Sequence, residues 1–137
     1  MGDASVKTMV IPSQLDQVAL VAEALLQDLE AVNTFSKEAI FAIRLALDEA
    51  VTNAVRHGNQ LAPDKTATIT YAITPQTCRI TVCDQGPGFT LCDVPDPTEE
   101  QNLCRPHGRG VMLMHAYMDE VSFNDTGSCV TLVKHAQ

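Results

Sequence analysis

The chain has 137 residues, of which 45% are apolar and 19% charged, and this is enough for one domain with its own core. Nine Lys and Arg residues against 17 Asp and Glu residues give a net charge of −8, and the basic residues are scattered. Such a chain is poorly suited to direct contact with a nucleic-acid backbone, and its few aromatics disfavour base stacking. Any phosphate must therefore be bound locally, through backbone N–H groups, a metal ion or one or two placed cations.

The sequence also indicates the cellular compartment of the protein. No apolar run follows a basic N-terminal segment, and no stretch of about 18 apolar residues occurs. We therefore expect neither a secretory signal nor a contact with membranes. Five cysteines, an odd number without a Cys-x-x-Cys pair, favour reduced thiols over a disulfide framework. These features predict a cytoplasmic protein.

The first half of the chain is predicted to contain one strand and two helices. The apolar-rich segment 6–11 is expected to be a strand, and Ser13 is expected to cap a helix whose apolar residues recur at helical spacing over 15–29. Ser36 is expected to cap a second helix, over 37–57, with one apolar face.

Three polar residues of the second helix form a row. Glu49, Asn53 and His57 are four residues apart and lie on a face away from the apolar one. Taken alone, such a row is more often surface than site. Its short carboxylate, amide and imidazole groups differ, however, from the long, mixed-sign charges typical of a solvated face.

The second half of the chain is predicted to form two hairpins that flank a loop and a third helix. Period-2 alternation predicts antiparallel hairpins of 66–74 with 78–83 and of 121–123 with 129–133. Residues 90–107 contain three prolines and four acidic residues, and we interpret this long loop as a lid. The third helix is expected over 108–118.

This element order predicts the fold class. Strands in hairpins with helices between them favour an α+β two-layer sandwich, with a mixed, mostly antiparallel sheet that carries helices on one face. We expect residues 1–137 to form a single domain.

Four of the seven glycines lie in two Gly-x-Gly pairs that bracket the loop 90–107. The first pair is in Asp84–Phe89 (DQGPGF) and the second is Gly108–Gly110 (GRG). Neither completes a P-loop or a dinucleotide fingerprint. One such pair is typical of a turn, but two pairs around one loop, together with Glu49 and Asn53 on one helix, favour a binding site.

These segments resemble the motifs of a known superfamily. Glu49–Asn59 (EAVTNAVRHGN) resembles the N-box of the ATPases that include gyrase, histidine kinases, ninety-kilodalton heat-shock chaperones and mismatch-repair ATPases. Asp84–Phe89 resembles their first glycine box, and Gly108–Gly110 resembles the second. The three boxes occur in order and the resemblance covers essentially the whole chain. Within the superfamily, Leu47–Ala54 and Gly108–Val121 look most like bacterial anti-sigma-factor serine kinases.

The resemblance implies a site for ATP and Mg²⁺. The side-chain oxygen of Asn53 would be the magnesium ligand, since magnesium prefers oxygen and often takes a single ligand from protein. Glu49, one turn earlier, would accept the proton of an attacking hydroxyl. Asp84 would accept a hydrogen bond from the exocyclic amine of adenine.

Further roles follow from the same resemblance. Gly86 and Gly88 would let the backbone approach the base, and His57 and Gly58 would bound the pocket. The hydroxyl of Thr131 would support the adenine-binding carboxylate. The backbone N–H groups at the start of the third helix would bind the phosphates; they belong to Gly108, Arg109, Gly110 and Val111. The side chains of Arg105 and Arg109 would add positive charge.

The function implied is that of an ATP-dependent protein serine/threonine kinase that is also an anti-sigma factor. It would phosphorylate an anti-anti-sigma protein on serine and sequester a sigma factor, acting as a homodimer. Two alternatives stay open. One is a regulatory module that binds ATP or a partner without catalysis. The other is a stand-alone histidine-kinase-like ATPase domain, which predicts a phosphoacceptor histidine on a helical dimerisation segment.

Overall fold

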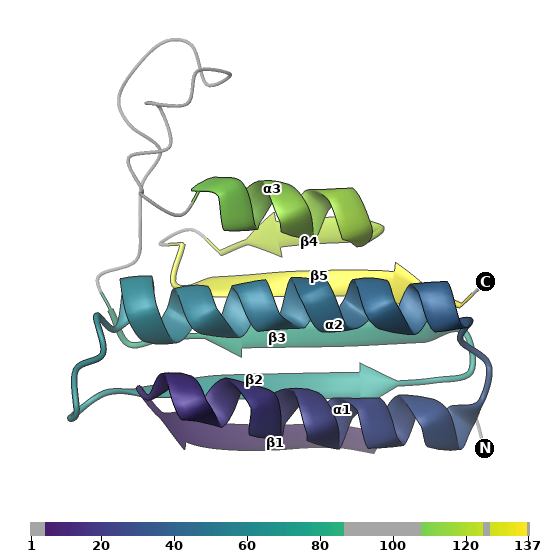
Figure 1. Cartoon of the computed structure of the whole chain (residues 1–137), viewed down its shortest axis with the longest axis horizontal. Helices are drawn as coiled ribbons and strands as arrows, with labels where there is room; N and C mark the ends of the chain where they lie inside the picture. Colours follow the sequence, from purple (N-terminus) through teal and green to yellow (C-terminus); the bar gives the residue numbers. More distant parts are fainter. Residues whose placement is uncertain (1–4, 87–107, 125–126, 137) are drawn as a thin grey trace, which may run out of the picture.

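A computed structural model describes residues 5–86, 108–124 and 127–136 of the chain. In these residues the helices lie over one face of a five-stranded sheet, so that the sheet is one layer and the helices are the other (Figure 1). The elements in chain order are β1 (Ser5–Pro12), η1 (Leu15–Gln17), α1 (Val18–Val32), α2 (Lys37–Thr52), η2 (Asn53–Gly58), β2 (Thr66–Ile73), β3 (Thr77–Cys83), α3 (Gly108–Tyr117), β4 (Glu120–Phe123) and β5 (Cys129–His135).

The sheet has the strand order β1-β2-β3-β5-β4, and every neighbouring pair is antiparallel. The α+β sandwich is thereby confirmed, and its sheet is antiparallel throughout the described strands rather than mixed. Both predicted hairpins are present, as β2–β3 and β4–β5. The pairing of β3 with β5 joins the two hairpins at the centre of the sheet.

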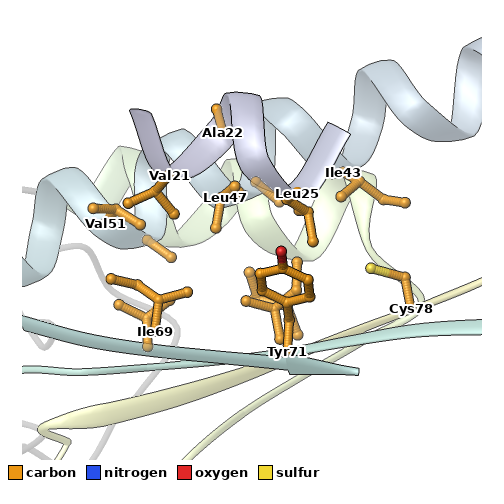
Figure 2. Packing of buried hydrophobic residues seen from close by; sticks show 14 of the residues in the cluster. Val21, Ala22, Leu25, Ile43, Leu47, Val51, Ile69, Tyr71 and Cys78 are labelled. Atoms are coloured by element: carbon orange, nitrogen blue, oxygen red, sulfur yellow. The ribbon is translucent and has the colours of Figure 1, made fainter. Parts of the chain in front are cut away.

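The core lies between the sheet and the helices. Alternate residues of β2 and β3 are buried, as the period-2 pattern predicts, and they point toward apolar residues of α1 and α2 (Figure 2). Leu25 of α1, Leu47 of α2 and Ile69 of β2 are at most 1% exposed. Burial of a side chain of this size contributes roughly 1.5–3 kcal/mol, so this interface holds the helices on the sheet.

The two predicted helix caps have different outcomes. Ser36 caps α2 as expected, because its hydroxyl oxygen accepts a hydrogen bond of 3.0 Å from the N–H of Ala39. Ser13 does not cap a helix, and that prediction is wrong. The chain instead enters the short 3₁₀ helix η1 after Gln14, while the buried Ser13 hydroxyl donates to the carbonyl of Lys65 over 2.7 Å. The Ser13 hydroxyl therefore bonds to a backbone carbonyl that is distant in the sequence and not to an N–H group of the helix that follows it.

The helix predicted over 37–57 consists of α2 and, directly after it, the π-helical turn η2. The N–H of Asn59 reaches back five residues to the carbonyl of Ala54, over 2.8 Å. Such wide turns are rare and are frequent at functional sites.

The expectation of reduced thiols is wrong for one pair of cysteines. Cys83 and Cys129 form a disulfide between β3 and β5, while Cys78 is a buried free thiol. The two bonded residues are 46 positions apart but face each other in the strand register, which the cysteine count does not show.

The predicted lid, residues 90–107, lies outside the described residues. Within the described part of the chain, every helix is too short or too polar to cross a membrane.

Candidate functional site

Four elements converge at one end of the molecule. The C-terminal ends of η2 and β3 lie at the same end of the sheet as the starts of β5 and α3 (Figure 1). The N-box ends in η2, Asp84–Gly86 of the first glycine box follow β3, and the second glycine box begins α3. The fold therefore brings the described parts of the three motifs to one end of the sheet (Figure 1).

Asp84 occupies the centre of this end, directly after β3. Its N–H donates to the carbonyl of Ser128 over 2.8 Å, which continues the β3–β5 ladder by one step. Its Oδ1 accepts a hydrogen bond of 2.9 Å from the N–H of Gly86. The backbone and one carboxylate oxygen of Asp84 are thus fixed by the turn in which it lies.

Two glycines allow the N-box and the first glycine box to touch. A Cβ on Gly58 would collide with the carboxylate of Asp84, and a Cβ on Gly86 would collide with the carbonyl of Gly58. No larger residue fits at either position without moving its neighbour. Gly58, Gly86 and Asp84 therefore form one close-packed cluster. In this cluster the side-chain carboxylate of Asp84 lies against the last residue of η2.

Asn59 holds the chain segments behind this cluster, and the sequence analysis missed it. The residue is 1% exposed, and its Oδ1 accepts from the N–H of Gln85 over 2.7 Å. Its Nδ2 donates to Ser13 Oγ and to the carbonyl of Thr66, both over 2.9 Å. The side chain of Gln85 in turn accepts from the N–H of Thr66 over 2.7 Å. The amide of Asn59 thus links the end of β1, the start of β2 and the turn that carries Asp84.

Asn53 is the buried polar residue of the predicted row. It is 8% exposed, and its Nδ2 has no hydrogen-bond partner among the described residues. Buried amides are almost always satisfied, so this N–H donor is available to a water or to a bound ligand. The amide also carries an oxygen of the kind that Mg²⁺ accepts. The half-buried Glu49 lies one turn earlier, and these two side chains fit a magnesium nucleotide.

The remaining predicted residues are distributed as follows. His57 is half-buried in η2, next to Gly58. Residues 108–111 form the first turn of α3, whereas Gly88 and Arg105 lie outside the described residues. Thr131 lies apart, since its neighbours in β5 point into the core and its Oγ1 is 3.1 Å from that of Thr81 on the outer face.

Ser128, the residue directly before β5, contacts Asp84. Its carbonyl accepts from the Asp84 N–H, a contact that only the strand register reveals. No local sequence signal distinguishes it from the other turn residues around Gly127.

Comparisons with known proteins agree with this geometry. The family model of the histidine kinase-like ATPase domain matches residues 11–134. The chain is 29% identical over 135 residues to the serine-protein kinase RsbW of Listeria monocytogenes, covering 93% of this chain and 85% of that protein. It is 31% identical over 100 residues to the anti-sigma F factor of Anoxybacillus flavithermus, covering 68% of this chain and 67% of that protein.

A solved structure shares the fold. The RsbU and RsbW domains of Rv1364c from Mycobacterium tuberculosis superpose with a TM-score of 0.61 at 17% identity. The match covers 97% of this chain and 32% of that longer chain. Because the family model matches nearly the full length, and the described parts of the three motifs lie at one end of the sheet, the chain belongs to the histidine kinase-like ATPase domain family.

Proposed function

We propose that this protein is an ATP-dependent protein serine/threonine kinase and an anti-sigma factor of the cytoplasm. The observation that carries the proposal is the contact of Asp84 with Gly58 and Gly86, on the same helix end as the orphaned amide of Asn53. Similarity to proteins named serine-protein kinase RsbW and anti-sigma F factor supports the choice of reaction.

In this proposal Asp84 recognises adenine. Its Oδ1 is engaged by the N–H of Gly86, so the carboxylate is oriented before any ligand arrives. A carboxylate accepts from the exocyclic amine of adenine and disfavours guanine, which has a carbonyl at that position. Gly86 and Gly88 would let the backbone approach the base, while His57 and Gly58 would bound the pocket.

Asn53 and Glu49 serve the phosphate end. Asn53 would hold the metal through its Oδ1, and a bound Mg²⁺ would supply charge neutralisation for the phosphates. Glu49 would take the proton of the serine hydroxyl that attacks the γ-phosphate. The first turn of α3, from Gly108 to Val111, would offer N–H groups to the phosphates, with Arg105 and Arg109 adding positive charge.

The proposed substrate is a serine of a small anti-anti-sigma protein, and the proposed client is a sigma factor bound by a homodimer. The test is incubation of the purified protein with Mg²⁺, γ-labelled ATP and candidate anti-anti-sigma proteins. Label on a serine of one of them is the expected result. Nucleotide binding with no transfer to any candidate would favour the non-catalytic module, and label on a histidine of this chain would favour the histidine-kinase-like alternative.

Two variants separate binding from chemistry. Glu49→Ala is expected to retain ATP binding and to lose phosphotransfer by about two to four orders of magnitude, the usual contribution of a positioned base. Asp84→Asn is expected to weaken ATP binding and its preference over GTP. If Glu49→Ala transfers phosphate normally, or if Asp84→Asn binds ATP as the unmodified protein does, the corresponding role is excluded.

A further inference from the structure

The two cysteines of the disulfide occupy a particular place in the sheet. Cys83 is the last residue of β3, Cys129 is the first residue of β5, and the two are directly paired with their Cα atoms 4.0 Å apart. The N–H of Asp84 donates to the carbonyl of Ser128, so the cysteines form a non-hydrogen-bonded pair. The covalent bond thus ties the two strand ends together directly beside the last hydrogen bond of the β3–β5 ladder.

The pair is placed where reagents can reach it. The neighbouring Val82 and Val130 point into the core, so Cys83 and Cys129 lie on the opposite face of the sheet, which the described helices do not cover. Both cysteines are partly exposed. Cys78, on the inner face of the same strand, is fully buried, and burial raises the pKa of its thiol to about 12. β3 therefore carries one cysteine of the accessible pair, Cys83, and one buried, inert thiol, Cys78.

The pair is one residue away from the proposed adenine-binding carboxylate. Cys83 precedes Asp84 in the chain, and Cys129 follows Ser128, to which Asp84 is hydrogen bonded over 2.8 Å. On its other side Cys129 is held by Asn124, whose Oδ1 accepts from the Cys129 N–H over 3.1 Å. A change in the separation of the two cysteines would therefore alter the adjoining hydrogen bond between the Asp84 N–H and the Ser128 carbonyl.

We propose that Cys83 and Cys129 are a reversible thiol–disulfide site whose oxidation state sets the affinity for adenine nucleotides. The proposal rests on the proposed function for the identity of the ligand. In a reducing compartment a disulfide is usually transient and regulatory, which agrees with a pair that adjoins a binding site rather than one that fastens the core. The disulfide holds Asp84 in its binding position, and the dithiol lets the strand ends separate.

The chemistry needs one partner of defined class, a small-molecule disulfide. The thiolate of one cysteine attacks a sulfur of that disulfide and expels a thiolate, which gives a mixed disulfide. The second cysteine then attacks the mixed disulfide, the Cys83–Cys129 bond forms and a second thiol leaves. The protein loses two electrons and two protons, and the small disulfide gains both to become two thiols.

The experiment uses the full chain with Cys92→Ser and Cys104→Ser, so that Cys83 and Cys129 are the accessible thiols under test. The protein is equilibrated in glutathione buffers of graded redox poise. The disulfide is measured by thiol alkylation and peptide mass spectrometry, and the affinity for ADP and ATP by calorimetry. We expect the oxidised form to bind about two- to tenfold more tightly, the range typical of coupling between neighbouring residues.

Matched variants assign the effect. Cys83→Ser with Cys129→Ser should bind with the affinity of the reduced form in every buffer, whereas Cys78→Ala should keep the full redox response. The proposal is overturned if the disulfide does not form at any poise, or if it forms and the affinity stays the same. Absence of nucleotide binding in both redox states would instead refute the proposed function from which the ligand was taken.

Discussion

Two groups of buried or half-buried polar side chains lie at different places in this fold, and their hydrogen bonding differs. In the first, Asp28 of α1 accepts from Lys7 Nζ over 2.8 Å and from the Tyr71 hydroxyl over 2.7 Å. In the second, Asn53 carries an orphaned amide nitrogen at the start of η2, the turn whose last residue, Gly58, contacts Asp84. The first group connects α1 to β1 and β2 with its partners in place. In the second group a buried N–H donor has no partner among the described residues, as expected of a site that binds a ligand.

The comparison also shows where close packing is required. Around Asp28 the side chains are long and can adjust, whereas around Asp84 two glycines are in backbone contact. Substitutions at the site should therefore affect both ligand binding and stability, and substitutions at Asp28 should affect stability alone. Four substitutions, taken from the largest expected effect on nucleotide binding to the smallest, test this distinction.

Gly86→Ala is expected to have the largest effect. Its Cβ would meet the carbonyl of Gly58, and because both partners are backbone, one segment must move. We expect nucleotide affinity to fall at least about tenfold, with a loss of about 1–3 kcal/mol in the free energy of unfolding. Calorimetric titration with ADP and urea unfolding measure the two quantities.

Gly58→Ala provides the comparison for Gly86→Ala. Its Cβ would displace the side chain of Asp84 rather than backbone, so a smaller loss of stability and a comparable loss of binding are expected. Normal nucleotide affinity in both variants would show that the glycine contact plays no part in the site.

Asn59→Ala removes the amide behind the site. It leaves the N–H of Gln85 and the carbonyl of Thr66 without their partner, and because both groups are only part-buried, each costs less than the roughly 1–3 kcal/mol of a buried one. We expect an unfolding free energy lower by about 1–2 kcal/mol and a nucleotide affinity that is reduced even where the variant is fully folded. Urea unfolding and nucleotide titration at low temperature measure both effects.

The control for this variant is Asn33→Ala, at the left-handed C-cap of α1, where φ is 59°. It should cost about 1 kcal/mol and leave nucleotide affinity unchanged. Equal affinities in the two variants would assign Asn59 to folding alone.

Asp28→Asn is expected to have the smallest effect and none on binding. The Lys7 hydrogen bond, and then that of Tyr71, hold the pKa of the Asp28 carboxyl below its ordinary value. The ionised group therefore stabilises the fold above about pH 4, and this contribution is lost as the pH falls through the lowered pKa of the folded state.

At pH 7 we expect Asp28→Asn to lower the unfolding free energy by about 1 kcal/mol, since the pair is partly exposed. The difference from the unmodified protein should shrink below about pH 4, measured by urea unfolding at both pH values. The exposed Asp16→Asn is the control, and an effect of Asp28→Asn that is independent of pH would contradict the ionic origin.

Periodicity predicted the elements of the described residues well, because each element exposes one face and buries the other. The strand over 66–74 is β2, and the helix over 37–57 is α2 with η2. The motif resemblance placed Asp84, Gly58 and Gly86, which the structure brings into contact. Their roles in binding and catalysis stay predictions, as do those of Glu49 and Asn53.

What the sequence did not reveal depends on pairing between distant segments. Asn59 was predicted only as part of the N-box and Ser13 as a helix cap, whereas the two side chains are hydrogen bonded to each other over 2.9 Å. The Cys83–Cys129 bond and the contact of Asp84 with Ser128 follow from the β3–β5 register. Local propensity depends on residues that are close in the sequence, whereas the pairing register of two strands depends on the whole assembled sheet.

The π-helical turn η2 makes the winding of the N-box as important as its residue types. An α-helix advances by about 100° per residue, and the wide turn accommodates one residue more than an α-helical turn would. If the same residues wound as an ordinary α-helix, the N–H of Asn59 would meet the carbonyl of Val55 instead of that of Ala54, and Gly58 and Asn59 would be rotated by about 100° relative to α2. Asp84 would then face a different side chain, although every motif residue is retained. In this fold the site depends on how the chain winds between the magnesium-binding amide proposed here and the glycine that contacts Asp84.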